Sequence, residues 1–337
     1  MSEEVEPDPA ATPRERLDWL DKLISNLIEQ RNGIAGGLMD AKVLHGEPVY
    51  DPAREAKIAE AGHEAMLPVI RAERLKHAST RTLNPALPLL AGGTRPKLVA
   101  GPCSVESKDT AVRSAAMARS LGIPYLRGGC WKPRTKAASW QGAGDDALGW
   151  ITDAAKEFGL GSVVEVVDSR TAVMAQAMGV TVMQVGARNA QNYELLKTLN
   201  SMKAPVLLKR GPGMTVEEWL GAASYLEDCP LTLCERGVSS FENSTRNMLD
   251  MAGAVLAAMQ SGRQVIIDPS HATGSPALIK ALAPAIAALR PWIHGAIVEF
   301  HPDIPSARTD QAQALDGDGL IVVADAMSAT PTCNGSL

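Results

Sequence analysis

The stretch LVAGPCSVESKDTAVRSAAMARS (98–120) decides the fold, because a short apolar run is followed by a polar turn and then by an amphipathic helical segment. The same unit recurs along the chain. Its further apolar runs are PYLRG (124–128), SVVEV (162–166), TVMQV (181–185), PVLLK (205–209), LTLCE (231–235), QVIID (264–268) and GAIVEF (295–300). Helical segments are expected near 109–120, 144–158, 169–178, 191–199, 215–227, 245–258 and 275–289. Eight strand–helix units in about 220 residues predict an α/β fold, the (β/α)8 TIM barrel, whose active site lies at the carboxyl ends of its strands.

An open doubly wound sheet is the alternative architecture. A dinucleotide-binding sheet of that kind carries G-x-G-x-x-G after its first strand. The corresponding string here is GPCSVE (101–106), which lacks the pattern. The sequence therefore favours the closed barrel.

A small all-α helical domain is expected before the barrel. Apolar residues recur at spacings of three and four over 14–45, which predicts a long amphipathic helix that starts at Thr12 and Pro13. A turn and a second helix, from about 53 to 74, follow. We therefore assign residues 1–83 to a helical domain, 84–96 to a linker, 97–325 to the barrel and 326–337 to a disordered tail.

The composition excludes several classes of protein. The 337 residues are 45% hydrophobic and 21% charged, which is typical of a globular chain, and their formal net charge is −5. Nucleic acids and anionic membranes attract proteins with an excess of Lys and Arg, so no partner of either kind is expected. The five cysteines are scattered without a C-x-x-C pair, as in proteins with reduced thiols. Without a signal peptide or an apolar window of ~20 residues, we expect a cytoplasmic protein.

Polar and charged side chains gather at the ends of the predicted strands. Since strand ends meet at one rim of a barrel, these side chains are expected to converge. They are Cys103, Arg127, Lys132, Arg188, Lys209, Arg210, Glu235, Arg236, Asp268, His271, Glu299 and Asp310.

Four of these side chains have the donors of a metal site. They are the thiol, imidazole and two carboxylates of Cys103, His271, Glu299 and Asp310. Mixed sulfur, nitrogen and oxygen donors suit Mn²⁺, Fe²⁺, Co²⁺ or Zn²⁺ and disfavour Mg²⁺ and Ca²⁺. A single buried cysteine or hydrogen-bonded histidine is more commonly structural, and the spacing is not that of a zinc finger. The shared location of the four is what favours a metal.

The cations at the rim form a second set. They are Arg127, Lys132, Arg134, Arg188, Lys209 and Arg236. Most surface Lys and Arg are merely solvated, but a ring of cations at strand ends loses hydration unless an anion compensates the loss. Phosphorylated or carboxylated small molecules are the expected partners.

Eight strings along the barrel carry a family resemblance. They are GPCSVES (101–107), RGGCWKPRT (127–135), QVGARNAQN (184–192), LLKRG (207–211), CERG (234–237), STRNMLD (244–250), DPSHATG (268–274) and VEFHPD (298–303). In this order they resemble the type I 3-deoxy-D-arabino-heptulosonate 7-phosphate (DAHP) synthases, in the branch that also contains the octulosonate phosphate synthases. The resemblance implies a metal-dependent barrel that condenses phosphoenolpyruvate with erythrose 4-phosphate, the first step of the shikimate pathway toward the aromatic amino acids. Octulosonate synthases carry K-A-N-R-S where this chain has KPRT (132–135), which favours the four-carbon aldose phosphate.

The resemblance also implies roles for single residues. The metal ligands would be Cys103, His271, Glu299 and Asp310, with Mn²⁺ as the first choice of ion and Co²⁺, Fe²⁺ or Zn²⁺ as alternatives. Phosphoenolpyruvate would be held by Arg127, Lys132, Arg188, Lys209 and Arg236, and the phosphate of erythrose 4-phosphate by Arg134 and Thr135. The catalytic residues would be Lys132, Cys103 and His271. Cationic neighbours are expected to lower the pKa of Lys132, so that it donates a proton to the developing alkoxide.

The chain departs from the family strings near the expected aldehyde site. RTKAASWQG (134–142) replaces the frequent R-T-S-P-Y-S-F-Q-G, and GVSSFE (237–242) replaces a string that commonly carries Arg and Thr. SARTDQAQ (306–313), around Asp310, stands where D-G-P/A-Q is common. One alternative is therefore a paralogue of a specialised pathway that uses a modified aldose phosphate. Another is a non-catalytic binding partner of a shikimate-pathway enzyme, against which the intact metal and lysine set argues.

The N-terminal region resembles the all-helical chorismate mutases. Six residues match their pocket for chorismate in type and spacing: Arg14, Arg31, Lys42, Asp51, Arg54 and Glu55. The third helix of that fold is expected to be shortened, because Pro68 interrupts it and no Gln occurs between Gln30 and Gln141. We therefore expect a degenerate mutase that dimerises or regulates the barrel, with prephenate or chorismate as effector. A bifunctional enzyme with mutase activity is the alternative, and the resemblance implies a homodimer or homotetramer.

Overall fold

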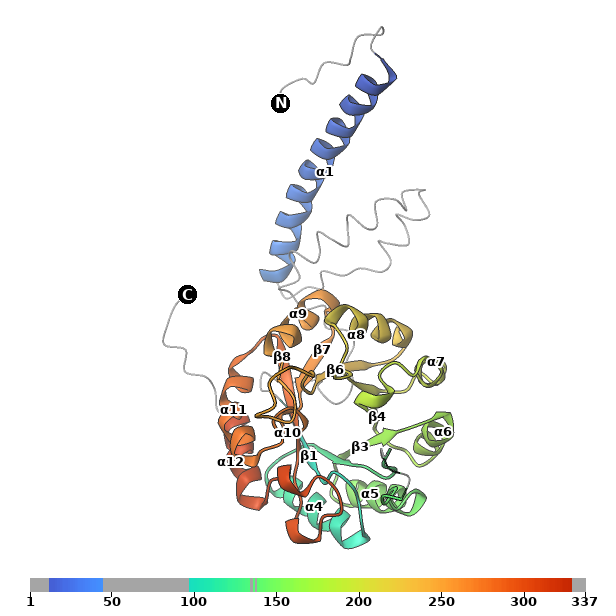
Figure 1. Ribbon diagram of the computed structural model, residues 1–337, viewed down its shortest axis with the longest axis vertical. Helices are drawn as coiled ribbons and strands as arrows, with labels where there is room; N and C mark the ends of the chain where they lie inside the picture. Colours follow the sequence, from blue (N-terminus) through green and yellow to red (C-terminus); the bar gives the residue numbers. More distant parts are fainter. Residues whose placement is uncertain (1–11, 45–96, 134–135, 137, 329–337) are drawn as a thin grey trace. The chain divides into compact units, whose positions relative to one another are not determined.

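The computed structural model describes residues 12–44, 97–133, 136 and 138–328. The chain divides into two compact units, Met1–Thr82 and Leu83–Leu337. The helix α1 (Pro13–Leu44) belongs to the first unit, and the second is a closed barrel surrounded by helices (Figure 1). The predicted second helix and the linker at 84–96 lie outside the described residues.

The helix α1 begins where the sequence predicts. Thr12 and Glu15 form a reciprocal cap: the Glu15 carboxylate accepts from the Thr12 N–H at 2.8 Å, and the Thr12 hydroxyl accepts from the Glu15 N–H at 3.4 Å. Pro13 occupies the first helical position, where a missing N–H costs no hydrogen bond.

The second unit confirms the predicted (β/α)8 barrel. Its eight strands are parallel and close in chain order. They are β1 (Lys97–Gly101), β2 (Tyr125–Gly128), β3 (Gly161–Val166), β4 (Val182–Val185), β5 (Val206–Lys209), β6 (Leu231–Glu235), β7 (Gln264–Ile267) and β8 (Ile293–Glu299). Each apolar run of the sequence coincides with one strand.

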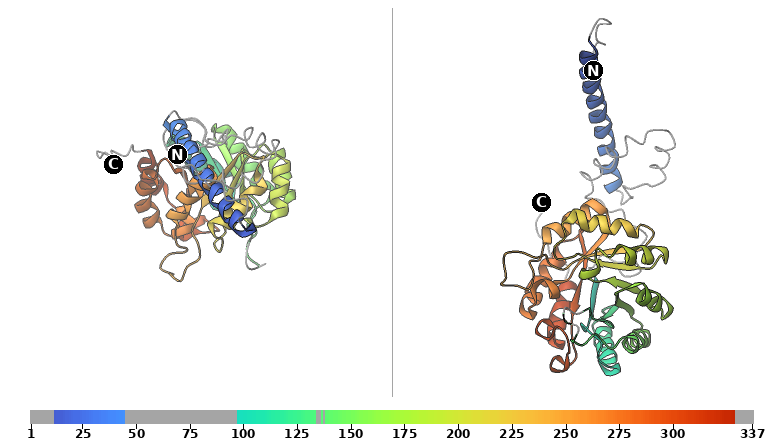
Figure 2. Two further views of the ribbon diagram at one scale, coloured as in Figure 1. Left: turned by 90° about the horizontal axis from the view of Figure 1, so that it is seen from above. Right: turned by 45° about the vertical axis from the view of Figure 1, so that its right-hand side comes forward.

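Helices surround the strands, as Figures 1 and 2 show. They are α4 (Lys108–Ser120), α5 (Asp145–Glu157), α6 (Ser169–Ala177), α7 (Tyr193–Ser201), α8 (Val216–Ala223), α9 (Met251–Ser261), α10 (Pro269–Thr273), α11 (Pro276–Ala288) and α12 (Gly317–Ser328). Short 3-10 turns are η2 (Ala187–Asn189), η3 (Ser224–Leu226), η4 (Ile304–Ser306) and η5 (Gln311–Gln313).

Two boundaries differ from the sequence prediction. The helix expected from residue 245 begins at Met251, because the Asp250 side chain caps the Gly253 N–H at 2.7 Å, and because the Asn247 N–H donates to Ala272 instead of continuing a helix. The helix α12, which the sequence analysis missed, continues through residues 326–328 of the predicted tail, and the buried Met327 holds this end against the barrel. Residues 329–337 lie outside the described residues.

An apolar layer fills the inside of the barrel with one side chain from each strand. The layer consists of Val99, Tyr125, Val163, Val182, Leu207, Cys234, Ile266 and Ile297, all of them buried. Successive side chains of a strand point to opposite faces, so the residues between them, such as Leu98 and Ala100, pack against the helices instead.

A polar layer lies above the apolar one. The residues two positions further along each strand point inward again, and nearly all of them carry polar groups. They are Gly101, Arg127, Glu165, Gln184, Lys209, Arg236, Asp268 and Glu299. The alternation thus places the apolar layer beneath the polar layer, whose charged groups lie at the carboxyl ends of the strands.

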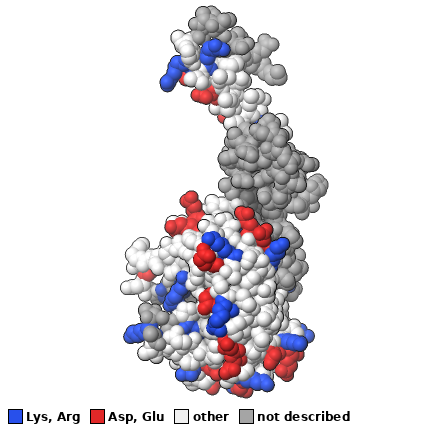
Figure 3. Space-filling model, turned by 90° about the vertical axis from the view of Figure 1, so that its right-hand side faces the viewer, with Lys and Arg blue, Asp and Glu red and all other residues white. Residues whose placement is uncertain are grey.

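No described helix is both long and apolar enough to cross a bilayer. On the face of the barrel in Figure 3, acidic and basic side chains are interspersed.

The apolar layer inside the barrel should contribute much of the stability of this unit. We expect Leu207→Ala to lower the free energy of unfolding by about 2–5 kcal/mol, because the side chain is fully buried and its loss leaves a cavity. Leu278→Ala, at a position 40% exposed on α11, serves as the matched control and should cost much less. Urea denaturation followed by circular dichroism measures both. Equal effects would contradict the importance of this layer.

Candidate active site

A cavity of about 610 Å³ opens at the carboxyl ends of the strands. Among the described residues, seven cations line it: Arg127, Lys132, Lys136, Arg188, Lys209, Arg236 and Arg246. Within the same part of the chain, the carboxylates in the lining are those of Glu165 and Asp310. The cavity is therefore suited to anions, although the whole chain is acidic.

Three of the four predicted metal ligands lie together at one side of this cavity. One ligand atom each from Cys103, Glu299 and Asp310 lies within 4.8 Å of the other two. Cys103 follows β1, Glu299 ends β8 and Asp310 precedes η5. Because the barrel closes by pairing β1 with β8, residues from the first and the last strand lie side by side. The Cys103 thiol donates to Asp310 Oδ2 at 3.1 Å.

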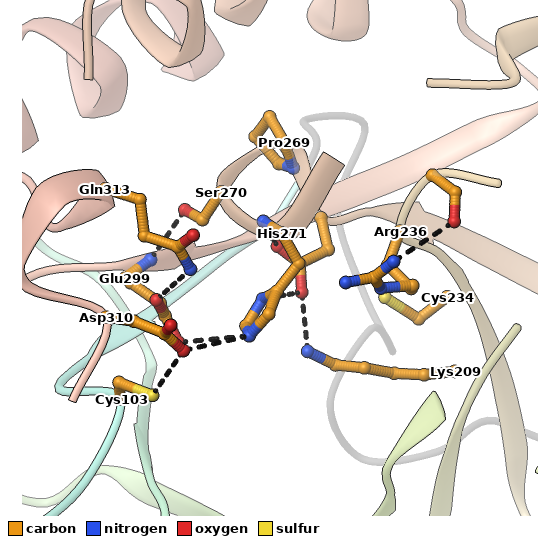
Figure 4. A network of polar contacts seen from close by, with 12 residues as sticks. Cys103, Lys209, Cys234, Arg236, Pro269, Ser270, His271, Glu299, Asp310 and Gln313 are labelled. Atoms are coloured by element: carbon orange, nitrogen blue, oxygen red, sulfur yellow. Dashed lines mark hydrogen bonds and ion pairs between the residues drawn. The ribbon is translucent and has the colours of Figure 1, made fainter. Parts of the chain in front are cut away.

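His271 is aimed at the same cluster by its neighbour Asp268. Asp268 caps α10 through the His271 N–H at 3.0 Å, and its other oxygen lies 2.7 Å from Nδ1 of the ring. Nε2 then lies 3.3 Å from Glu299 Oε1 and 4.0 Å from Asp310 Oδ2 (Figure 4). A carboxylate behind a histidine is the usual support of a metal-binding imidazole.

The donor set fits a divalent ion of the borderline class. A thiol, an imidazole nitrogen and carboxylate oxygens are the ligands such ions prefer. Burial and the negative charge of Glu299 raise the pKa of the Cys103 thiol to about 12. A bound cation would compensate the thiolate charge, and binding would therefore release the thiol proton.

The two carboxylates of the cluster are stabilised as anions. Burial opposes ionisation of Glu299, but His271, Arg127 and Lys132 outweigh it and hold its pKa well below the ordinary value. Burial and Glu299 likewise oppose ionisation of Asp310, while Arg246 and His271 lower its pKa. Both oxygen donors are thus available for a cation at neutral pH.

The environment of Lys132 corrects one prediction. Its ammonium group lies 3.0 Å from the Cys103 sulfur and 3.1 Å from the Cys103 carbonyl oxygen. Burial alone would lower its pKa, but Cys103, Glu165 and Glu299 outweigh both burial and Arg127, so the pKa is raised and not lowered. The expected lowering of the pKa rested on the cationic neighbours, whereas Cys103 and the carboxylates of Glu165 and Glu299 decide its direction.

The predicted phosphoenolpyruvate cations all reach the cavity, with different partners. Arg127 is paired with Glu299 at 2.8 Å and Lys209 with Asp268 at 2.5 Å. Arg188, in η2, is exposed. Arg236 is 7% exposed and donates to the Gly237 carbonyl at 3.3 Å; within the described residues it forms no ion pair with a carboxylate.

Several site residues were missed at the sequence level. Glu165 and Gln184 occupy the inward positions of β3 and β4, a position that the alternation along each strand could have identified. Arg246 and Gln313 contact the carboxylates of the predicted metal ligands. Arg246 lies in STRNMLD (244–250), a string of the family resemblance, and Gln313 in the altered stretch around Asp310, and the spacing in neither gave a reason to assign them a role.

The predicted residues for the phosphate of erythrose 4-phosphate and for the mutase-like pocket lie wholly or partly outside the described residues. Arg134 and Thr135 lie outside the described residues. Of the mutase-like set, Arg14 and Arg31 are described on α1, where Arg14 lies 3.9 Å from Asp18 in an exposed pair. The side chain of Lys42 and the residues Asp51, Arg54 and Glu55 lie outside the described part. The mutase-like pocket stays a prediction.

The chain is similar to known proteins of one family. Residues 78–332 match the model of the DAHP synthetase I family. The chain is 40% identical over 224 residues to a phospho-2-dehydro-3-deoxyheptonate aldolase of Thermotoga maritima, and the match covers 65% of each chain, slightly less than two thirds of the relative's length. A 2-dehydro-3-deoxyphosphooctonate aldolase of Acidithiobacillus ferrooxidans is 28% identical over 239 residues, which cover 64% of this chain and 83% of the relative.

A solved structure shares the same architecture. The crystal structure of a DAHP synthase from Thermotoga maritima matches with a TM-score of 0.65 and 37% identity, covering 68% of this chain and 67% of that one. The family match spans all eight strands, the ligand cluster and the cationic cavity. This chain therefore belongs to the DAHP synthetase I family.

Proposed function

We propose that the protein condenses phosphoenolpyruvate with erythrose 4-phosphate to give DAHP and inorganic phosphate. The observation that carries the proposal is the Arg236 guanidinium, which is buried at the cavity without a carboxylate in an ion pair among the described residues. Burial lowers the pKa of this group despite the nearby Asp268. A desolvated cation is costly unless an anion compensates it, and phosphoenolpyruvate brings a phosphate and a carboxylate.

The cationic lining supports a fixed orientation of this substrate. Arg236, Lys209 and Arg188 would bind its anionic groups, with Arg127 at the side of the metal cluster. Lys209 and Arg127 are themselves held by Asp268 and Glu299, so their positions do not depend on the substrate. Such a preorganised set reduces the entropy cost of aligning the enol carbon with the aldehyde.

The metal cluster would lie beside the aldehyde. Cys103, His271, Glu299 and Asp310 would hold a divalent ion, Mn²⁺ by preference, which when bound supplies Lewis-acid chemistry at the aldehyde oxygen. The C3 carbon of phosphoenolpyruvate forms a bond to the aldehyde carbon, and the carbonyl electron pair moves onto the aldehyde oxygen. Lys132 would give its proton to this oxygen, since an alkoxide is a stronger base than an amine even when the pKa of the lysine is raised.

The second half of the reaction needs a base for water. Water adds to the cationic C2 carbon and loses one proton, which leaves a hydroxyl group on C2. The bond from C2 to the phosphate oxygen then breaks, the hydroxyl becomes the C2 carbonyl, and its proton passes to the released phosphate. The Glu165 carboxylate lines the cavity and acts electrostatically on Lys132. It is the candidate acceptor of the proton that the attacking water loses. Its place on β3 directs it into the barrel.

A second candidate aldehyde is favoured by the loop after β2. The Arg308 guanidinium lies 4.6 Å from the ring centroid of Trp140 in this loop, so this residue of the altered string contacts the loop that carries Asp310. A modified aldose phosphate of a specialised pathway is thus the alternative substrate. Comparing kcat/KM for erythrose 4-phosphate with that for other aldose phosphates decides between them.

Metal-stripped protein should not release phosphate from the two substrates, and Mn²⁺ should restore release. The reason is that the thiol, imidazole and carboxylate donors provide a site for an ion that polarises the aldehyde. A colorimetric phosphate assay with erythrose 4-phosphate measures the effect. Full turnover in protein verified to be free of metal would refute the metal requirement.

Cys103→Ala should abolish this metal-restored turnover, by at least about 10³-fold, since it removes a ligand. Cys229→Ala is the matched control, because Cys229 is also buried but its thiol contacts the Leu199 carbonyl between helix and strand, away from the cavity. The control should retain activity. If the protein is instead a non-catalytic binding partner of another enzyme, neither variant should differ from the parent in phosphate release.

Arg236→Met should weaken phosphoenolpyruvate binding by about tenfold or more, because a charge-assisted hydrogen bond is lost. The same variant should not lower the melting temperature of the unliganded protein, since it removes a buried cation without an ion-pair partner. Calorimetric titration and thermal unfolding measure the two effects. Arg113→Met, at an exposed arginine paired with Asp109, is the control. Unchanged affinity in Arg236→Met would remove the main support for the proposed substrate.

A further inference from the structure

We propose that Gln313 and Arg246 act as a positioning pair that holds the two carboxylate ligands, Glu299 and Asp310, in the arrangement that a divalent ion requires. The inference rests on the metal site of the proposed function and extends it to two residues that would touch neither the ion nor the reacting atoms. Both are charged or polar side chains whose partners are specific atoms of the ligands.

Gln313 is buried, at 3% exposure, and follows Asp310 within η5. Its amide nitrogen donates to Glu299 Oε2, and its amide oxygen accepts from Arg246 Nη1 (Figure 4 shows Gln313 beside Glu299). An amide can donate at one end and accept at the other, which a carboxylate at this position could not do. The side chain type is therefore matched to both neighbours.

Arg246 holds the other carboxylate in the same manner. Its Nη1 donates to Asp310 Oδ1 at 3.1 Å, while Asp310 Oδ2 faces Cys103 at 3.1 Å. In Glu299, Oε2 accepts from Gln313, while Oε1 lies 3.3 Å from His271 Nε2 and also accepts from Arg127 at 2.8 Å. Each carboxylate thus uses one oxygen for the positioning pair, and its other oxygen lies next to another predicted ligand.

The backbone around Arg246 is itself fixed to the helix that carries His271. The Arg246 N–H donates to Thr273 and the Asn247 N–H to Ala272, while the Asn247 side chain donates to the His271 carbonyl at 2.9 Å. The segment after β6, which contributes no predicted ligand, consequently contacts two of the four, Asp310 and His271. Orienting groups of this type typically change metal affinity by about 10–100-fold when they are removed.

Electrostatics and positioning make opposite predictions for Arg246. A cation close to the site repels a divalent ion, so removing its charge alone should strengthen metal binding. If Arg246 orients Asp310, removing it should weaken metal binding in spite of the lost repulsion. The sign of the change therefore separates the two roles.

The experiment titrates metal-stripped, full-length protein with Co²⁺ and follows the thiolate-to-cobalt charge-transfer absorption together with the heat of binding. Gln313→Ala and Arg246→Met are each expected to raise the Kd for Co²⁺ by about tenfold or more. Gln311→Ala is the matched control, because this glutamine lies in the same turn but donates to the Ile304 and Pro305 carbonyls. Its Kd should stay within about threefold of the parent.

Several results would overturn the inference. Tighter Co²⁺ binding by Arg246→Met would show that Arg246 acts only as a charge that repels the ion. An unchanged Kd for Co²⁺ in folded Gln313→Ala would show that Gln313 does not position Glu299. If Gln313→Ala fails to fold, Arg246→Met decides alone, since its side chain is 36% exposed and tolerates replacement. A parent that binds no Co²⁺ also overturns the inference. A parent that binds Co²⁺ with this pattern of variants but does not release phosphate leaves the inference supported and refutes the proposed function.

Discussion

The structure depends on the alternation of side chains along parallel strands that close into a barrel. Each strand must direct one side chain inward and the next toward a helix, and closure makes all inward side chains share one small interior. In this chain the lower inward positions are apolar and the upper ones polar, with Leu207 below Lys209 as an example. One geometric rule therefore creates both the core that stabilises the barrel and the floor of the site.

The upper layer is stable because its charges compensate one another across strands. Arg127 of β2 pairs with Glu299 of β8, and Lys209 of β5 pairs with Asp268 after β7. A buried ion pair contributes little to stability in itself, but removing one partner leaves an uncompensated charge. Arg236 differs from this pattern within the described residues, and that difference is what favours an anionic ligand.

Much of this arrangement could be predicted from the sequence, for identifiable physical reasons. Each strand was visible as an apolar run, and residues at strand ends such as Cys103 and Glu299 had to converge once the barrel was inferred. Arg246 and Gln313 could not be assigned, since the first lies in an irregular loop whose path follows from its hydrogen bonds to α10. The pKa of Lys132 was predicted in the wrong direction because the sign depends on which charges are nearest, a three-dimensional quantity.

The filled interior also has a consequence for access to the cavity. The apolar layer leaves no passage through the barrel, so the cavity above it has a closed bottom and is reached from the carboxyl side of the strands. Any molecule that contacts Lys209 and Arg236 therefore has to enter and leave on this side, because buried side chains fill the barrel beneath them.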